Sequence, residues 1–122
     1  SMALDIPDTP VVARMDADAF GIIAGNLIDN ALQHGAAGQM VQVTLSQDGV
    51  LRVVNEGPVV SPEELTQLTK RLHQGPVATD GFGLGLYIVD TISRQVGSSL
   101  ELYSPARGRP AGFEARFAAP MR

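Results

Sequence analysis

Two asparagines, Asn26 and Asn30, stand four residues apart in a segment with helical periodicity. Residues four apart share one face of a helix, and Gln33 and His34 continue that face one turn later. Asparagine is a mediocre helix former, so two on one face invite a functional reason. Amide oxygens suit Mg²⁺, which takes one or two protein oxygens plus phosphate oxygens and water. A solvated helix face with two incidental amides explains the spacing equally well.

A glycine-rich segment, residues 81–86 (GFGLGL), leads directly into another segment of helical character. Alternate glycines let backbone N–H groups turn toward a ligand, and a helix N-terminus adds partial positive charge, so the run suits phosphate. The spacing differs from the dinucleotide-binding G-x-G-x-x-G, and the Walker A lysine is absent. Taken alone, the run is equally compatible with a flexible hinge.

A third polar position, Asn55, follows an apolar strand-like run and precedes Glu56-Gly57-Pro58. A polar side chain just past a strand points into the cleft that the strand ends border, and the neighbouring glycine lets a flat ring approach the backbone. An ordinary strand-to-loop turn is the simpler interpretation of these residues by themselves.

The rest of the chain supplies the elements that would position these residues. After an extended lead-in over residues 1–14, the patterns predict helices over about 16–34, 62–73 and 84–96, and strands over 40–45, 50–54, 100–103 and 113–117. Asp16 or Asp18 would cap the first helix and Gly35 would end it, while Ser61 and Glu64 form a capping box before the second helix. A hairpin turn is predicted at Asp48-Gly49. The helical side chains expected to face the core are Phe20, Ala24, Leu27, Ala31, Leu65, Leu68, Leu72, Ile88, Val89 and Ile92. Strands adjacent in sequence would pair antiparallel, with all three helices on one face. The predicted fold class is α/β, a two-layer α/β sandwich with a mixed, mostly antiparallel sheet, forming a single domain over residues 1–122.

Composition narrows the classes of function. The 122 residues suit one domain, and 9 basic against 13 acidic residues give a net charge of −4 without any Lys/Arg run, so no nucleic-acid partner is expected. The chain has no cysteine, which excludes a disulfide framework and a Cys-ligated zinc site. Ser1-Met2 is typical of a cloning remnant, so we expect a piece cut from a longer protein.

Taken in order, the three motifs resemble the catalytic ATP-binding domain of bacterial two-component sensor histidine kinases. Residues 26–34 (NLIDNALQH) resemble the N box of that family, and residues 55–58 (NEGP) resemble its first glycine box, D-x-G-x-G. Residues 81–89 (GFGLGLYIV) resemble the second glycine box, G-x-G-L-G-L-x-I-V. The resemblance runs from Asp16 to Pro120, nearly the whole chain.

The resemblance implies a role for each matching position. Asn30 would be the main Mg²⁺ ligand with Asn26 beside it, Asn55 would face the adenine amino group, and Gly57 would lie under the purine. Residues 59–82 would form a lid over ATP. The backbone amides of the second glycine box would hold phosphate, and the remaining members of the boxes would complete the nucleotide site: Gln33, His34, Gly81, Gly83, Leu84, Gly85 and Leu86.

The same resemblance implies a kinase in preference to a hydrolase. Related ATPases carry a water-activating Glu four residues before the metal-binding Asn, where this chain has Asn26, and an amide cannot take a proton at neutral pH. The phosphoryl acceptor would be a histidine on a separate dimerisation domain, followed by a response regulator; neither His34 nor His73 is expected to be that acceptor. This chain would then be a monomer, the cytoplasmic part of an inner-membrane sensor kinase.

Several positions depart from the family pattern, mostly around the expected adenine site. Asn55 replaces Asp, Val59 replaces Gly, and Gln33 replaces a basic residue. Residues 70–75 lack two phenylalanines, and Gly112-Phe113 stands where Gly-Thr is common. Two alternatives stay open: a degenerate nucleotide-binding or pseudokinase interaction domain, and an anti-sigma-factor-type serine kinase.

Overall fold

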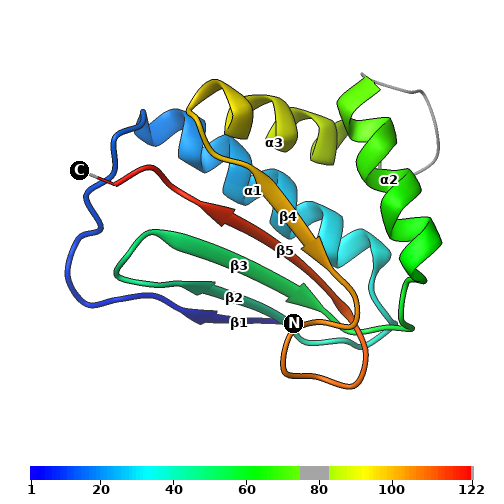
Figure 1. The fold of residues 1–122 in the computed structure, drawn as a ribbon. Helices are drawn as coiled ribbons and strands as arrows, with labels where there is room; N and C mark the ends of the chain where they lie inside the picture. Colours follow the sequence, from blue (N-terminus) through cyan, green and yellow to red (C-terminus); the bar gives the residue numbers. More distant parts are fainter. Residues whose placement is uncertain (75–82, 122) are drawn as a thin grey trace.

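In the computed structural model, which describes residues 1–74 and 83–121, three helices cover one face of a five-stranded sheet (Figure 1). The helices are α1 (Ala17–His34), α2 (Pro62–Gln74) and α3 (Gly83–Gln95), and the strands are β1 (Met2–Asp5), β2 (Val41–Leu45), β3 (Val50–Asn55), β4 (Leu100–Tyr103) and β5 (Phe113–Ala118). The strand order is β1-β2-β3-β5-β4, and β1–β2 is the parallel pair. The prediction of a two-layer α/β sandwich with a mixed, mostly antiparallel sheet is confirmed.

Strand β1 is the element that the sequence patterns did not predict. Residues 1–14 were expected to be an extended lead-in, but Met2–Asp5 pairs with residues 41–44 of β2. All four β1 residues are exposed, so no buried face gives this strand an alternation of apolar and polar positions. Its partner β2 determines this pairing at the edge of the sheet.

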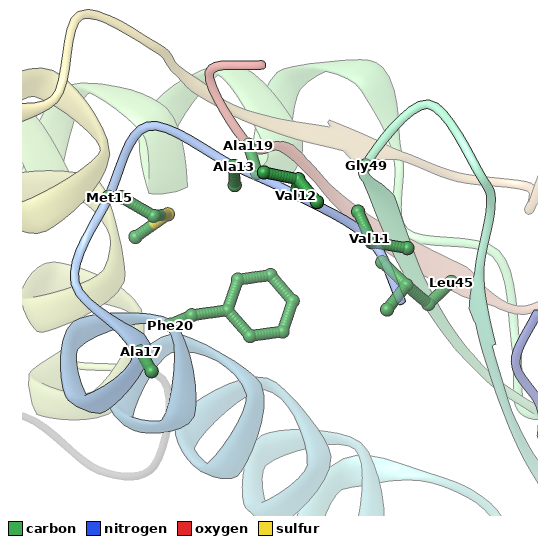
Figure 2. A pocket seen from close by; sticks show the side chains of 9 residues that line it. All are labelled: Val11, Val12, Ala13, Met15, Ala17, Phe20, Leu45, Gly49 and Ala119. Carbon is green, nitrogen blue, oxygen red and sulfur yellow. The ribbon is translucent and has the colours of Figure 1, made fainter. Parts of the chain in front are cut away.

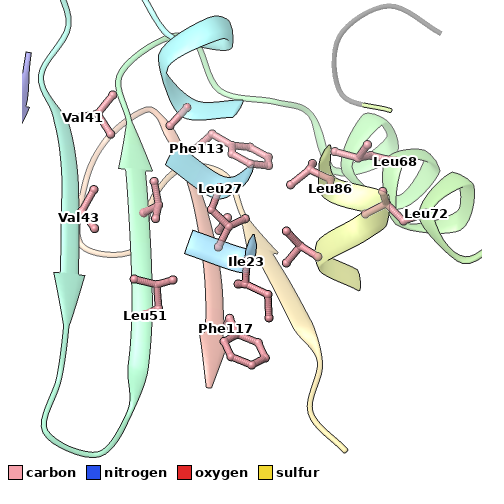
Figure 3. Close-up of a cluster of buried hydrophobic side chains, with 14 of the residues drawn as sticks. Ile23, Leu27, Val41, Val43, Leu51, Leu68, Leu72, Leu86, Phe113 and Phe117 are labelled. Atoms are coloured by element: carbon pink, nitrogen blue, oxygen red, sulfur yellow. The ribbon is translucent and has the colours of Figure 1, made fainter. Parts of the chain in front are cut away.

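The core lies between the three helices and the sheet (Figure 3). On α1, Leu27 and Ala31 are buried as predicted, and Ile23 is also fully buried. Phe20 and Ala24 are partly buried and pack against the same cluster. The sheet contributes apolar side chains from its helix-covered face: Val41, Val43, Leu51, Val53, Phe113, Ala115 and Phe117.

Helix α3 differs from the prediction in one position. Val89 is buried and Ile92 is partly buried, as expected, but Leu86 occupies the fully buried position and Ile88 is only half-buried. Leu86 therefore anchors the first turn of α3 in the core. None of the helices in the described part of the chain is long and apolar enough to cross a membrane.

Helix α2 begins with the predicted capping box. The hydroxyl of Ser61 accepts a hydrogen bond from the Glu64 backbone N–H at 3.2 Å, and the Glu64 carboxylate accepts one from the Ser61 backbone N–H at 3.5 Å. The predicted apolar face is also confirmed, because Leu68 and Leu72 are buried and Leu65 packs against the core. This face fixes α2 against the rest of the domain.

The N-terminus of α1 lacks the side-chain cap that the sequence predicts. Asp16 stands at the N-cap in an extended conformation, but its side chain makes no capping hydrogen bond. Gly35 ends the helix, as predicted, at φ −87° and ψ 178°, which is ordinary extended backbone.

The sheet face opposite the helices carries a buried ion cluster on β5. Glu114 is 0% exposed and accepts hydrogen bonds from Arg52 Nε and from the Arg107 backbone N–H, both at 2.8 Å. Arg116 Nε lies 3.5 Å from the same carboxylate, and Arg52 also donates to the Arg107 carbonyl at 2.9 Å. These contacts fasten the loop between β4 and β5 onto the uncovered face of the sheet.

Candidate functional site

Asn30 is a nearly buried amide in the last turns of α1. Its residue is 8% exposed, and within residues 1–74 and 83–121 no protein group forms a hydrogen bond with its side chain. The amide atoms themselves are not fully enclosed, so the side chain stays open to solvent and to a ligand. A ligand that binds this amide would supply the missing partner.

The first turn of α3 packs directly against Asn26, on the same face of α1. Asn26 Nδ2 donates to the Ile22 carbonyl at 2.9 Å, which holds the side chain along its own helix. A Cβ atom built on Gly85 would lie 3.2 Å from Asn26 Oδ1, tighter than nearly all real Cβ contacts. Glycine at position 85 therefore lets α3 approach the polar face of α1.

The second glycine box supplies the N-terminus of α3. Gly83, Leu84, Gly85 and Leu86 form its first turn, where backbone N–H groups lack partners within the helix and the macrodipole is positive. Leu84 is 63% exposed, whereas Leu86 is buried in the core and fixes the turn. The structure thus brings the backbone amides expected to bind phosphate next to the face of α1 that carries Asn26 and Asn30 (the asparagine face). Gly81 lies outside the described residues.

Asn55 is the last residue of β3 and is 5% exposed. Its Nδ2 donates to the Glu56 carbonyl at 3.2 Å, and its Oδ1 has no partner among the residues that the structure describes. Gly57 accepts a hydrogen bond from the Gly112 backbone N–H at 3.0 Å. A Cβ on Gly112, at φ +91°, would lie 2.6 Å from the Asn55 carbonyl oxygen, so only glycine fits there.

The remaining predicted positions are spread more widely. Gln33 is exposed on α1 and His34 is half-buried at its end, while Val59 is exposed. Within the predicted lid, residues 62–74 form α2, and residues 75–82 lie outside the described part of the chain. The predicted lid stays a prediction.

Gln39 belongs to this region although no motif indicated it. The residue is 7% exposed; its Nε2 donates to the Ala31 carbonyl at 2.8 Å, and its Oε1 accepts from the Glu56 backbone N–H at 3.0 Å. A Cβ on Gly35 would come within 1.8 Å of Gln39 Oε1, which explains the glycine at the end of α1. Gln39 lies in a loop without periodicity, so the sequence carried no signal for it.

A separate apolar cavity of about 410 Å³ lies at the opposite end of α1 (Figure 2). The Phe20 ring and the Met15 side chain border it, and every lining residue is apolar or glycine: Val11, Val12, Ala13, Met15, Ala17, Phe20, Leu45, Gly49 and Ala119. Phe20 and Asn30 are ten residues apart on one helix, roughly 15 Å along its axis. The cavity has no groups for phosphate or metal and is distinct from the asparagine face.

The metal chemistry open to the asparagine face is restricted. Among the residues that the structure describes, no group of three His, Cys, Asp or Glu side chains could hold a metal ion. A cation bound beside Asn30 would therefore use the amide oxygen, phosphate oxygens and water. That donor set is the one that Mg²⁺ takes with nucleotides, so the residues fit Mg²⁺ held together with a polyphosphate.

Comparison with known proteins agrees with this geometry. Residues 15–122 match the family described as histidine kinase-, DNA gyrase B- and HSP90-like ATPases. The sensor histidine kinase YcbM of Bacillus subtilis is 34% identical over 116 residues, 89% of this chain and 37% of that protein. The sensor protein QseC of Escherichia coli is 38% identical over 96 residues, 78% of this chain and 20% of that protein. The chain thus spans less than two fifths of the length of either relative.

Solved structures show the same fold. The mycobacterial sensor histidine kinase MprB superposes with a TM-score of 0.75 at 26% identity, over 99% of this chain and 84% of that one. The catalytic domain of the histidine kinase ThkA gives a TM-score of 0.78 at 19% identity, over 98% of this chain and 79% of that one. The chain therefore belongs to the histidine kinase-, DNA gyrase B- and HSP90-like ATPase family, as a catalytic domain of the sensor histidine kinase kind.

Proposed function

We propose that this chain binds ATP together with Mg²⁺ and delivers the γ-phosphoryl group to a histidine on a separate dimerisation domain. The observation that carries the proposal is Asn30, a nearly buried amide with no described protein partner, on the same face of α1 as Asn26, against which the first turn of α3 packs at Gly85. An amide oxygen and a turn of free N–H groups bind a cation and a polyphosphate respectively, and Mg·ATP presents both.

Each end of the nucleotide would have its own set of residues. Asn30 would hold the Mg²⁺ ion, and the backbone amides of residues 83–86 would hold phosphate oxygens. Asn55 and Gly57, at the end of β3, would face the adenine ring, with Asn55 Oδ1 accepting from the exocyclic amine. The bound Mg·ATP supplies the reactive phosphoryl group; the chain's own residues orient it and exclude water.

Among the described residues, position 26, four before the proposed metal ligand, is not suited to activating water. At position 26 the chain has an amide whose nitrogen already donates to the Ile22 carbonyl, and an amide does not accept a proton at neutral pH. Phosphoryl transfer depends mainly on positioning and charge stabilisation, so a nucleophile supplied from outside completes it. His73 is engaged by Asp90 at 3.6 Å, which ties α2 to α3 and gives this histidine a structural role.

The partners follow from this proposal. The acceptor histidine belongs to the dimerisation domain of the same kinase, and a response-regulator receiver domain takes the phosphoryl group from it. The catalytic domain itself is monomeric and works in the cytoplasm. Support comes from the relatives, two of which are named as sensor kinases or sensor proteins that are much longer than this chain.

Calorimetric titration with a non-hydrolysable ATP analogue tests the nucleotide site. We expect micromolar to submillimolar affinity that depends on Mg²⁺ and that falls at least tenfold in Asn30→Ala, because the metal loses its protein ligand. The control is Leu32→Ala, which changes an exposed side chain on the same helix. No heat and no thermal stabilisation at millimolar nucleotide would refute the proposal in favour of a degenerate site.

Phosphoryl transfer needs a second assay. The chain is mixed with labelled ATP and the helical dimerisation domain of the parent kinase, and the product is treated with acid. Phosphohistidine is acid-labile and phosphoserine is acid-stable, so loss of label in acid supports the histidine kinase. Acid-stable label on serine would favour the serine kinase alternative.

A further inference from the structure

We propose that Gln39 is a positioning residue that sets the spacing between the two ends of the nucleotide site. Its side-chain amide contacts Ala31 and Glu56, the residues immediately following Asn30 and Asn55. The inference rests on the proposed function, in which Asn30 serves the metal and phosphate end and Asn55 serves the base end.

Both hydrogen bonds of the Gln39 side chain satisfy backbone groups that have no other role in regular structure. Ala31 is one of the last four residues of α1, whose carbonyls lack intrahelical donors, and it accepts from Gln39 Nε2 at 2.8 Å. Glu56 follows the end of β3, and its N–H donates to Gln39 Oε1 at 3.0 Å. One amide, with its donor and acceptor both used, therefore joins helix to strand.

Neighbouring contacts reinforce this junction. The Ala36 backbone N–H donates to the Glu56 carbonyl at 3.0 Å, and the Gln39 backbone N–H donates to the Ala36 carbonyl at 3.1 Å. Residues 36–39 therefore form a short bracket that runs from the end of α1 to the end of β3. The Gln39 side chain is buried inside this bracket, where an unpaired amide would be costly.

The loop after β3 is held independently on its other side. Ser104 Oγ accepts from the Val60 backbone N–H at 2.8 Å and donates to the Gly112 carbonyl at 2.7 Å. The Gly112 N–H donates to the Gly57 carbonyl at 3.0 Å. These contacts tie the loop to the sheet. The distance between the loop and α1 therefore depends on the contacts that residues 36–39 make, including those of the Gln39 side chain.

Gly35 provides an internal check on this arrangement. A Cβ at Gly35 would lie 1.8 Å from Gln39 Oε1 and 2.1 Å from its Nε2, so Gly35→Ala must displace the amide. The backbone at Gly35 is extended and tolerates alanine, and the three atoms nearest to the added Cβ all belong to the Gln39 side chain. Gly35→Ala is therefore expected to act only when Gln39 is present.

The test compares the whole nucleotide with its two halves. Wild-type chain and Gln39→Leu are titrated with a Mg·ATP analogue, with adenosine and with Mg·tripolyphosphate, and binding is followed by NMR chemical shifts. We expect Gln39→Leu to bind the whole nucleotide about tenfold more weakly, while each half binds within twofold of wild type, because only the spacing has changed. If Gln39 contributed to stability alone, the ratio of the affinity for the whole nucleotide to the affinities for its two halves would be the same in Gln39→Leu as in wild type.

Further variants separate a change in the spacing of the site from a general loss of stability. Ile23→Val shortens a fully buried core side chain on α1 and lowers stability without touching the bracket, so its ratio should equal that of wild type. Gly35→Ala should weaken binding of the whole nucleotide in the wild-type background and add less than a twofold loss in the Gln39→Ala background. If Gln39→Leu does not fold, this double-mutant cycle with Gly35 decides the question.

The outcomes separate the two proposals. A wild-type chain that binds no Mg·ATP analogue would refute the proposed function and this inference with it. A wild-type chain that binds the analogue, with an unchanged ratio in Gln39→Leu or with additive effects of Gly35→Ala and Gln39→Ala, would overturn the role of Gln39 and leave the proposed function standing.

Discussion

The substitution Asn55→Asp separates the stability of the empty site from its affinity for adenine. Asn55 Nδ2 donates to the Glu56 carbonyl at 3.2 Å, and Asn55 is 5% exposed. A carboxylate cannot donate, so the variant loses this bond and places two acceptor oxygens against each other. We expect the free energy of unfolding to fall by about 1–2 kcal/mol, the usual cost of a lost hydrogen bond with a buried group left unpaired.

Affinity for ATP should change in the opposite direction. An ionised acceptor makes a hydrogen bond roughly twice as strong as a neutral one, so the adenine amine should bind the new carboxylate about 1 kcal/mol more tightly, or about fivefold. Calorimetry with the Mg·ATP analogue measures this gain, and urea unfolding measures the loss of stability. The control is Glu56→Gln, which removes the neighbouring exposed charge without altering Asn55.

Inosine triphosphate makes the test sharper, because it carries an acceptor oxygen where ATP has the amine. The Asn55 amide could turn and donate to that oxygen only by losing its bond to the Glu56 carbonyl, so wild type should prefer ATP by about tenfold, the cost of one such bond. The Asn55→Asp variant has no donor, and its preference for ATP over inosine triphosphate should rise by about tenfold or more. A preference that is unchanged by the substitution would refute the placement of Asn55 at the base.

Three further predictions rest on contacts outside the base site. Gly85→Ala should lower affinity for Mg·ATP several-fold in calorimetry, because its Cβ would press on Asn26 Oδ1 at 3.2 Å and shift the first turn of α3; unchanged affinity would contradict this. Glu114→Gln should cost about 2–3 kcal/mol in urea unfolding, since one charge-assisted hydrogen bond is lost, while nucleotide affinity stays at the wild-type value. Ser61→Ala should cost about 1 kcal/mol through the lost cap of α2, and an unchanged unfolding midpoint would show that the capping box contributes nothing.

Elements with strong local signals could be predicted from the sequence. The apolar stripe of α1, the turn at Gly49 and the Ser61 capping box each depend on residues close together in the chain, and the structure shows all three. The two antiparallel strand pairs followed from the same local reasoning. Strand β1 could not be predicted, because its four residues are exposed and only pairing with β2 defines them.

The residues of the candidate site also fall into those that local spacing could predict and those that it could not. Asn26, Asn30 and the glycine run were visible through spacing, and the structure brings α1 and the first turn of α3 together around them. Gln39 was invisible because its partners, Ala31 and Glu56, are backbone groups that any residue could provide. Gly35 illustrates the same limit: a helix-ending signal was read correctly, while its physical cause is a side chain four positions later.

The position of β5 has a consequence for how the polypeptide folds. β5 is the last strand in chain order, yet it lies between β3 and β4 in the sheet, and its register joins Val50 to Ala118 (Figure 1). The sheet therefore stays divided until this strand emerges from the ribosome, and most of its pairing closes over long stretches of chain, which slows folding. Until then the core lacks Phe113, Ala115 and Phe117, which β5 supplies, so part of the apolar surface of the helices and of β3 stays uncovered. This domain therefore completes its structure late, after synthesis of β5, and the incomplete chain is prone to aggregate.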